Sequence, residues 1–267
     1  MALTTAPITP VRPNAIVGGG SAGIGKATGK ALALAGHRVV LVGRHIHSLH
    51  EAADEIAADT GVEVNVFAHD LAQVDTAGDF LDEVSARFGA PDVLVLNAGG
   101  PPPGRIVAIA DSDWRFAFDL LLLGPVRLAS LVLPGMAQRQ FGRVIVTTST
   151  AVRQPQPGLA ASVVLRSAMT AAAKLLSLEF AAEGVTVNCV APGSTATDRR
   201  AEIISARAAA SGRSFDEVSV EDAADLPVGR PAEPHEVADA IAFLASRAAG
   251  YINGTVLTVD GGRTVTI

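Results

Sequence analysis

Seven short apolar runs alternate with helix-like segments along almost the whole chain, and this alternation restricts the fold more than any other feature. Most of the runs are rich in Val, Leu and Ile, as in strands that are buried on both faces. Alternating strands and helices predict an α/β fold in which helices cover both faces of a parallel sheet. The predicted strands cover 15–19, 37–42, 62–70, 92–100, 142–149, 185–193 and 255–260.

The segments between these runs carry helical patterns. No internal repeat or low-complexity linker interrupts them, which predicts a single domain over residues 1–267. Residues 1–13 contain three prolines and are predicted to be flexible. Residues 198–227 are more polar and follow a break at Pro192-Gly193, so we interpret them as an insertion. The other predicted helices run from the glycine-rich turn to 35, and over 46–59, 73–88, 111–138, 160–182 and 233–247.

Composition and charge exclude several classes of function. With 49% hydrophobic and 18% charged residues the chain is not disordered, and a net charge of -6 argues against a nucleic-acid partner. The only cysteine, Cys189, lies in an apolar stretch, which favours an inert buried thiol. We predict no metal site, and no membrane span because Asp119 and Gly124 interrupt the most apolar stretch. We expect a cytoplasmic protein.

A glycine-rich turn, GGGSAGIG at 18–25, joins the first predicted strand to the first helix. Glycines let the backbone turn tightly and approach a phosphate, while free N–H groups at the helix start attract the anion. The alternative is a purely structural turn. The order strand, turn, helix favours a dinucleotide site on a Rossmann-type doubly wound sheet.

The end of the second predicted strand indicates which dinucleotide binds. Binders of the non-phosphorylated cofactor usually place an acid at this point, about 20 residues after the turn. This chain has Gly43-Arg44-His45 there. The planar guanidinium of Arg44 could pair with a 2′-phosphate, whereas the alternative is an ordinary solvated arginine. The sequence therefore favours NADP(H) over NAD(H).

On these residues the chain resembles the short-chain dehydrogenase/reductase family, over about residues 14–262. The match includes the glycine motif, in which Gly18 replaces the usual Thr, and Asn97-Ala98-Gly99 after the fourth predicted strand. It is most similar to divergent 3-oxoacyl-acyl-carrier-protein reductase-like members. The resemblance implies a cofactor site formed by Gly19, Ser21, Gly23, Ile24, Gly25, Arg44, Asp70, Leu71, Asn97, Ala98, Gly99, Arg166, Pro192, Gly193, Thr195 and Thr197.

The catalytic positions of that family are mostly replaced in this chain. Aligned with the Asn, Ser, Tyr and Lys of ordinary members, only Ser149 is retained. Ser162 stands at the tyrosine position and Arg166 at the lysine position. Leu121, seven residues after Trp114, stands at the asparagine position. The catalytic candidates are therefore Ser149, Ser162 and Arg166.

These replacements remove the usual proton donor. Serine is not a common general acid, and arginine is effectively always protonated and a poor member of a proton relay. Leu121 has no group that could hydrogen-bond a water in the proton path. Losing a positioned acid typically costs about 10² to 10⁴ in rate, which does not forbid hydride transfer.

Three functions remain open. The first is an NADPH-dependent oxidoreductase that acts on a carbonyl, imine or enone-type small molecule. The second is a non-redox dehydratase, isomerase or cyclase on the same fold. The third is a catalytically inactive binding subunit. The resemblance also implies a homo-oligomer, a tetramer or dimer assembled through helices 111–138 and 160–182, and a substrate lid at 198–227. The leucine stripes on those helices, which include Leu128, Leu131, Leu175 and Leu178, would equally serve the core of a monomer.

Overall fold

The fold is built on one seven-stranded sheet in which every neighbouring pair of strands is parallel, in the order β3-β2-β1-β4-β5-β6-β7. The structure is a computed structural model and describes residues 12–266, so most of the segment expected to be flexible (1–13) lies outside the described residues. The sheet confirms the predicted α/β class. The strands are β1 (Asn14–Gly18), β2 (Arg38–Gly43), β3 (Asn65–Ala68), β4 (Val93–Leu96), β5 (Gly142–Thr147), β6 (Val185–Pro192) and β7 (Val256–Val259).

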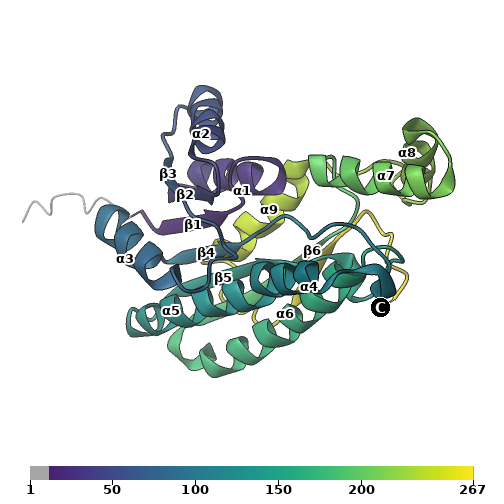
Figure 1. The fold of residues 1–267 in the computed structure, drawn as a ribbon. Helices are drawn as coiled ribbons and strands as arrows, with labels where there is room; N and C mark the ends of the chain where they lie inside the picture. The colour runs from purple at the N-terminus through teal and green to yellow at the C-terminus, as the bar shows by residue number, and fades with distance from the viewer. Residues whose placement is uncertain (1–11, 267) are drawn as a thin grey trace, which may run out of the picture.

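Helices cover both faces of the sheet (Figure 1). On one side lie α1, α2 and α9, and on the other α3, α5 and α6. The helices are α1 (Gly23–Leu34), α2 (Ile46–Thr60), α3 (Ala77–Phe88), α4 (Asp111–Phe118), α5 (Gly124–Gln138), α6 (Ala160–Glu179), α7 (Asp198–Ser211), α8 (Phe215–Ala224) and α9 (Pro234–Ala245).

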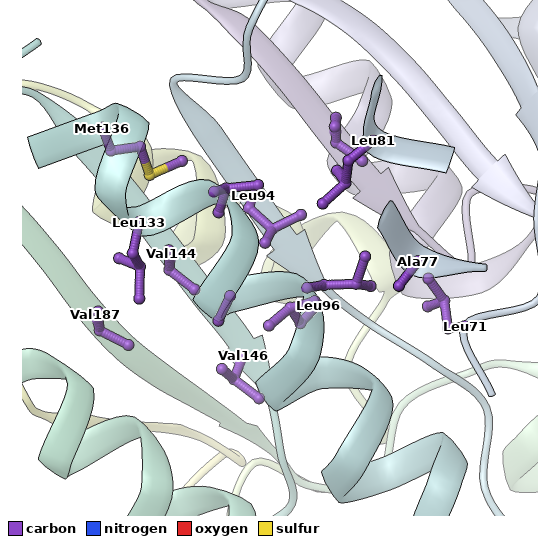
Figure 2. Close-up of a cluster of buried hydrophobic side chains, with 14 of the residues drawn as sticks. Leu71, Ala77, Leu81, Leu94, Leu96, Leu133, Met136, Val144, Val146 and Val187 are labelled. Atoms are coloured by element: carbon purple, nitrogen blue, oxygen red, sulfur yellow. The ribbon is translucent and has the colours of Figure 1, made fainter. Parts of the chain in front are cut away.

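Alternate residues of each strand supply the two cores. In β1, Ile16 packs into the cluster beneath α3, α5 and α6, whereas Ala15 and Val17 pack beneath α1, α2 and α9. This period of two is the geometry of a strand, in which successive side chains point to opposite faces. Figure 2 shows the first cluster, where Leu94 and Val144 of neighbouring strands meet side chains from the helices. Burial on both faces explains why the strands read as continuous apolar runs.

The predicted long helix over 111–138 is divided by a π-helical turn at Asp119–Leu123, which separates α4 from α5. Such single-turn π insertions occur often at functional sites. This helix, taken over 111–138, and α6 are long and apolar enough to span a membrane by length and composition. In the fold α5 and α6 pack along the sheet, where they contribute buried side chains such as Leu128 and Met169 to the core.

The order of the strands creates a switch point between β1 and β4, and the region outside the carboxyl ends of the strands at this point is called the crevice below. Going outward from β1, the chain proceeds to β2 and β3 on one side and to β4 and the later strands on the other. Ligands of open α/β sheets bind at this switch point, outside the carboxyl ends of the strands. The turns that carry the predicted cofactor residues all follow the carboxyl ends of β1, β2, β3, β4 and β6.

The segment 198–227 forms two helices, α7 and α8, which project away from the sheet (Figure 1). They pack against each other through a small cluster of Ile204, Ala208 and Val218. The predicted polar insertion is thus a helical pair with its own apolar contact.

Candidate functional site

The glycine-rich turn adopts a conformation that other residues would strain. Gly19 and Gly23 have φ angles of +61° and +52°. A Cβ atom on Gly25 would lie 2.0 Å from the carbonyl oxygen of Gly19. Ser21 is half-buried in the turn, and Ile24 packs against the core beneath α1. Helix α1 starts at Gly23 without a side-chain cap from Ala22, so no capping side chain occupies its first N–H groups, as an anion site would require.

The turn after β4 packs against the glycine-rich turn. The Asn97 side chain is buried, and its Nδ2 donates a hydrogen bond to the carbonyl oxygen of Gly18 at 3.1 Å. A Cβ atom on Gly19 would lie 2.7 Å from that same Nδ2. Two motifs 79 residues apart, around Gly18 and Asn97, are therefore interlocked at the switch point.

The ends of β2 and β3 lie side by side next to this turn. Arg44 follows β2 and is exposed, and the N–H of His69 donates to the carbonyl oxygen of Gly43 at 2.9 Å. Asp70 accepts a hydrogen bond from the N–H of Ala72 at 3.0 Å, and Leu71 is buried in the core. The His69 ring stacks on Phe80 with its centroid 4.3 Å away, and burial lowers the pKa of His69.

The segment 193–197, which follows β6, faces the glycine-rich turn from the other side. The N–H of Gly193 donates to Val259 at 2.9 Å, and a Cβ atom on Gly193 would lie 2.6 Å from Cβ of Asp260. Thr195 is buried, and the Thr197 hydroxyl accepts from the N–H of Arg200 as the N-cap of α7. Cγ2 of Thr197 lies opposite Gly23, where a Cβ atom would come within 3.1 Å of it. Pro192 is the buried last residue of β6.

Arg166 is the most distinctive residue of the site. Its Nη1 donates to the carbonyl oxygen of Thr147, at the end of β5, at 2.6 Å. Its Nη2 donates to the carbonyl oxygens of Ala98 at 3.3 Å and Gly99 at 3.0 Å. The guanidinium therefore bridges the turns that follow β4 and β5. A planar fork of donors suits this bridge, which the single ammonium group of a lysine would make less completely.

The charge of Arg166 has no acidic partner within residues 12–266. Burial, together with the nearby charge of Arg199, lowers the pKa of Arg166 to about 10. The side chain therefore carries a positive charge at neutral pH, in a position where water screens it weakly. Arg199 itself donates to the carbonyl oxygen of Pro101 at 2.7 Å and pairs with the exposed Glu202.

The two candidate serines have their oxygens occupied as acceptors. Nε of Arg166 donates to Oγ of Ser162 at 3.2 Å, one helical turn away on α6. Oγ of Ser149 accepts from the N–H of Ala151 at 3.1 Å, at the start of a 3₁₀ turn after β5. A serine hydroxyl that accepts from a protein group can still donate its own proton to something else. The hydroxyl protons of Ser149 and Ser162 therefore remain available for a further hydrogen bond.

Leu121 fills the place that the resemblance assigns to an asparagine. It lies in the π-helical turn and is buried against Ala117, Ala161 and Leu165. Behind it is a small cavity lined mostly by apolar side chains, together with Thr147, Thr148 and Arg166. The side chain at position 121 therefore provides no hydrogen-bonding group to this cavity.

Some features of this region could not be predicted from the sequence. Asp222 is a buried carboxylate that joins Ser194 to three arginines, although in the sequence it looks like an ordinary surface charge. Arg199 also lies close to Arg166, and the only sequence feature that pointed to a role for Arg199 was the arginine-rich stretch at 199–213. Tyr251, the only tyrosine of the chain, is fully exposed.

Comparison with known proteins finds relatives that are described as reductases. Residues 19–264 match the family profile described as enoyl-(acyl carrier protein) reductase. The chain is 32% identical over 249 residues to 3-oxoacyl-[acyl-carrier-protein] reductase from Escherichia coli, covering 93% of this chain and 96% of that protein.

Two solved structures are similar along nearly the whole chain. L-sorbose reductase from Gluconobacter frateurii, complexed with NADPH and L-sorbose, superposes with a TM-score of 0.88 at 32% identity and covers 96% of this chain and 98% of its own. YwfH, described as an NADPH-dependent reductase involved in bacilysin biosynthesis, gives a TM-score of 0.90 at 27% identity and covers 96% and 100%. With its sheet order, its interlocked glycine and Asn97 turns and these matches, the chain belongs to the short-chain dehydrogenase/reductase family.

Proposed function

We propose that this protein is an NADPH-dependent reductase of a polarised small molecule, with a carbonyl, an imine or an enone as the reacting group. The observation that carries the proposal is the pair of Arg166 and Ser162, a buried cation that contacts a hydroxyl at 3.2 Å beside the crevice. Relatives described as reductases, two of them named with NADPH, support the class of reaction.

The residues around the crevice fit a dinucleotide. Gly19, Gly23 and Gly25 leave space for a phosphate against the start of α1, and any side chain at Gly25 would collide with the backbone. Arg44 is exposed at the end of β2, where a guanidinium suits a 2′-phosphate, and no acid stands in its place. Asp70, Asn97, Gly193 and Thr195 would line the rest of the site. When bound, NADPH would supply the hydride.

The protein's own contribution is electrostatic. When a carbonyl or enone accepts a hydride, negative charge grows on its oxygen. When an iminium ion accepts a hydride, its positive charge is cancelled. Ser149 and Ser162 would each donate a hydrogen bond to that oxygen. Arg166 strengthens the Ser162 donor, because a hydroxyl that accepts from a cation becomes more acidic. Fixed donors of this kind lower the barrier without transferring a proton themselves.

This arrangement favours substrates whose reduction needs no strong acid. Reduction of a simple ketone leaves a basic alkoxide that must take a proton, whereas conjugate reduction leaves a delocalised enolate and reduction of an iminium leaves a neutral amine. Leu121 and its apolar neighbours provide no side chain that would carry a proton to an alkoxide. We therefore infer that enones are reduced faster than matched saturated ketones, whereas the buried charge of Arg166 opposes an iminium cation.

The test uses purified protein and NADPH absorbance. A cyclic enone, its saturated ketone and a cyclic iminium ion are compared at equal concentration. We expect NADPH oxidation with the enone and at least about tenfold less with the ketone, since a missing acid costs about 10² to 10⁴ in rate. The iminium ion should also react slowly, because the buried charge of Arg166 opposes a cation. Preference for the ketone would contradict the electrostatic mechanism. No oxidation with any of them would favour a non-redox enzyme or an inactive binding subunit.

We also propose that the protein is a cytoplasmic homo-oligomer, a dimer or a tetramer, with α7 and α8 as a lid over the site. Leu175 and Leu178 on α6 are 61% and 65% exposed, as residues of an unpartnered interface would be, whereas Leu128 belongs to the core. Light scattering of the purified protein distinguishes the oligomers from a monomer.

A further inference from the structure

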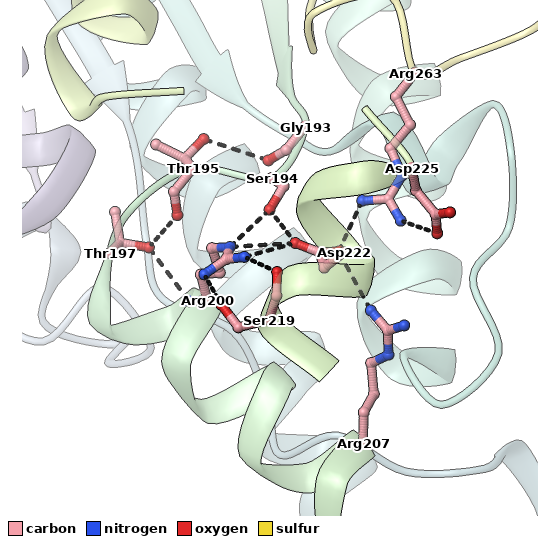
Figure 3. Close-up of polar contacts among 10 residues, drawn as sticks. All are labelled: Gly193, Ser194, Thr195, Thr197, Arg200, Arg207, Ser219, Asp222, Asp225 and Arg263. Carbon is pink, nitrogen blue, oxygen red and sulfur yellow. Dashed lines mark hydrogen bonds and ion pairs between the residues drawn. The ribbon is translucent and has the colours of Figure 1, made fainter. Parts of the chain in front are cut away.

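A buried carboxylate lies where the lid, the segment 193–197 and the C-terminal tail meet. Asp222 of α8 is 4% exposed. One of its oxygens, Oδ2, accepts from the Ser194 hydroxyl at 2.7 Å and pairs with Arg200 at 3.1 Å. The other, Oδ1, pairs with Arg207 at 3.3 Å and Arg263 at 3.1 Å. Figure 3 shows these side chains converging on Asp222 from α7, from the segment after β6 and from the tail.

The electrostatics keep Asp222 ionised. Burial alone would raise the pKa of Asp222, but the Ser194 hydroxyl, Arg263 and Arg200 outweigh it and lower the pKa below the usual value. A single anion thus neutralises part of the charge of three guanidinium groups. Removing one partner of a buried ion pair costs far more than removing an exposed one, because the remaining charges lose their compensation.

Ser194 connects this cluster to the crevice. Its hydroxyl donates to Asp222 and accepts from Nε of Arg200 at 2.9 Å. The residue lies between Gly193 and Thr195, in the segment whose Thr197 faces Gly23 of the glycine-rich turn. The backbone of this segment is also held by Ala232, whose N–H donates to the carbonyl oxygen of Ser194 at 2.9 Å. The orientation of Ser194 therefore depends on α8 as well as on the body of the protein.

The lid helices contact the body through the same cluster and, from α7, also through Arg199, which donates to the carbonyl oxygen of Pro101. Arg200 and Arg207 belong to α7 and Asp222 to α8, whereas Ser194 and Arg263 lie outside the lid. The apolar contact through Ile204, Ala208 and Val218 joins the two helices only to each other. A displacement of α8 would therefore shift the Ser194 side chain, which is hydrogen-bonded to Asp222.

We propose that Asp222 is a positioning residue that holds segment 193–197 in the geometry that binds the cofactor, and so couples the position of the lid to cofactor affinity. This inference rests on the proposed function. Asp222 touches neither the crevice nor the reacting groups and acts through Ser194.

The test compares three variants by NADPH fluorescence titration and by the rate at which trypsin cuts the lid after its arginines. Ser194→Ala removes the hydrogen bond between Asp222 and segment 193–197 but leaves the arginines paired with Asp222. NADPH binding should therefore weaken about tenfold, the scale of one hydrogen bond to a charged group. The rate of lid cleavage should be unchanged. Asp222→Asn should weaken binding at least as much and also speed lid cleavage. Asp222→Glu, which keeps the charge, should recover part of both.

Glu221→Gln is the matched control, because Glu221 forms an exposed ion pair with Arg213 in the same lid and its replacement leaves every arginine in place for trypsin. Exposed pairs contribute little, so both readouts should match wild type. Wild-type NADPH affinity in both Ser194→Ala and Asp222→Asn would overturn the coupling while leaving the proposed function intact. Wild-type protein that binds no NADPH would overturn the proposed function and this inference together.

Discussion

At the scale of single residues, Arg166 is both a structural bridge and the charge of the site. Replacing it with Met should destabilise the protein by about 2–4 kcal/mol, because the carbonyl oxygens of Thr147, Ala98 and Gly99 lose a charged donor in a buried place. Lys at this position should recover only part of the loss, since it lacks the planar fork. Urea unfolding measures the effect. Equal or higher stability of Arg166→Met would mean that burying the charge costs more than these bonds contribute.

The two serines should affect turnover more than binding. Ser149→Ala and Ser162→Ala should each lower kcat by about 10² with little change in KM, because each removes one donor to the charge that develops in the transition state. Ser167 lies on the same helix as Ser162 but donates to the carbonyl oxygen of Val163 at 2.7 Å, so Ser167→Ala is the control and should keep full activity. An increase in KM with unchanged kcat would instead assign the serines to substrate binding.

At the scale of secondary-structure elements, the π-helical turn at Asp119–Leu123 persists although an apolar residue occupies its centre. Restoring the family's asparagine by Leu121→Asn should lower stability by about 1–3 kcal/mol, because the amide would be buried against Ala117, Ala161 and Leu165. Leu123→Asn on the exposed side of the same turn should have little effect. Thermal unfolding compares them. A neutral Leu121→Asn would show that the turn offers the amide a partner.

Elements with strong side-chain patterns could be predicted from the sequence. The run at 142–149 became β5 (Gly142–Thr147), because continuous apolar residues mark a strand covered on both faces. Helix α3 starts at Ala77 instead of 73, since the N–H groups of Gln73 and Val74 close turns onto Asp70 and Ala72. Side-chain periodicity records such main-chain turns poorly, and the π-helical turn escaped it for the same reason.

The candidate site also contains some residues that could be predicted from the sequence and others that could not. The glycine-rich turn and Asn97-Ala98-Gly99 could be placed from the sequence because their order relative to the strands fixes their location. The Asp222 cluster could not, since Asp222 meets Ser194 from 28 positions away and Arg263 from 41. No local pattern encodes contacts at that separation. Likewise, Arg166 could be predicted as a site residue from the sequence, but the carbonyl oxygens to which it donates could not.

At the scale of the whole molecule, two histidines should make stability depend on pH. Burial lowers the pKa of His37 and of His69 in the folded protein. The unfolded chain therefore takes up protons first as the pH falls below about 6.5, and stability decreases. Urea unfolding at pH 7.5 and 5.5 should show a lower midpoint at 5.5, and His37→Gln should reduce the difference. An unchanged or higher midpoint at pH 5.5 would contradict this.

The central claim, that the crevice holds a phosphorylated nicotinamide dinucleotide, is tested most directly by titrating the purified protein with NADPH and with NADH while following nicotinamide fluorescence. We expect saturable binding of NADPH and binding of NADH weaker by about tenfold or more, the scale of one bidentate pair between a guanidinium and a phosphate. Arg44→Ala should bring the two affinities together. Failure to bind either dinucleotide would contradict the claim and leave the glycine-rich turn a purely structural feature.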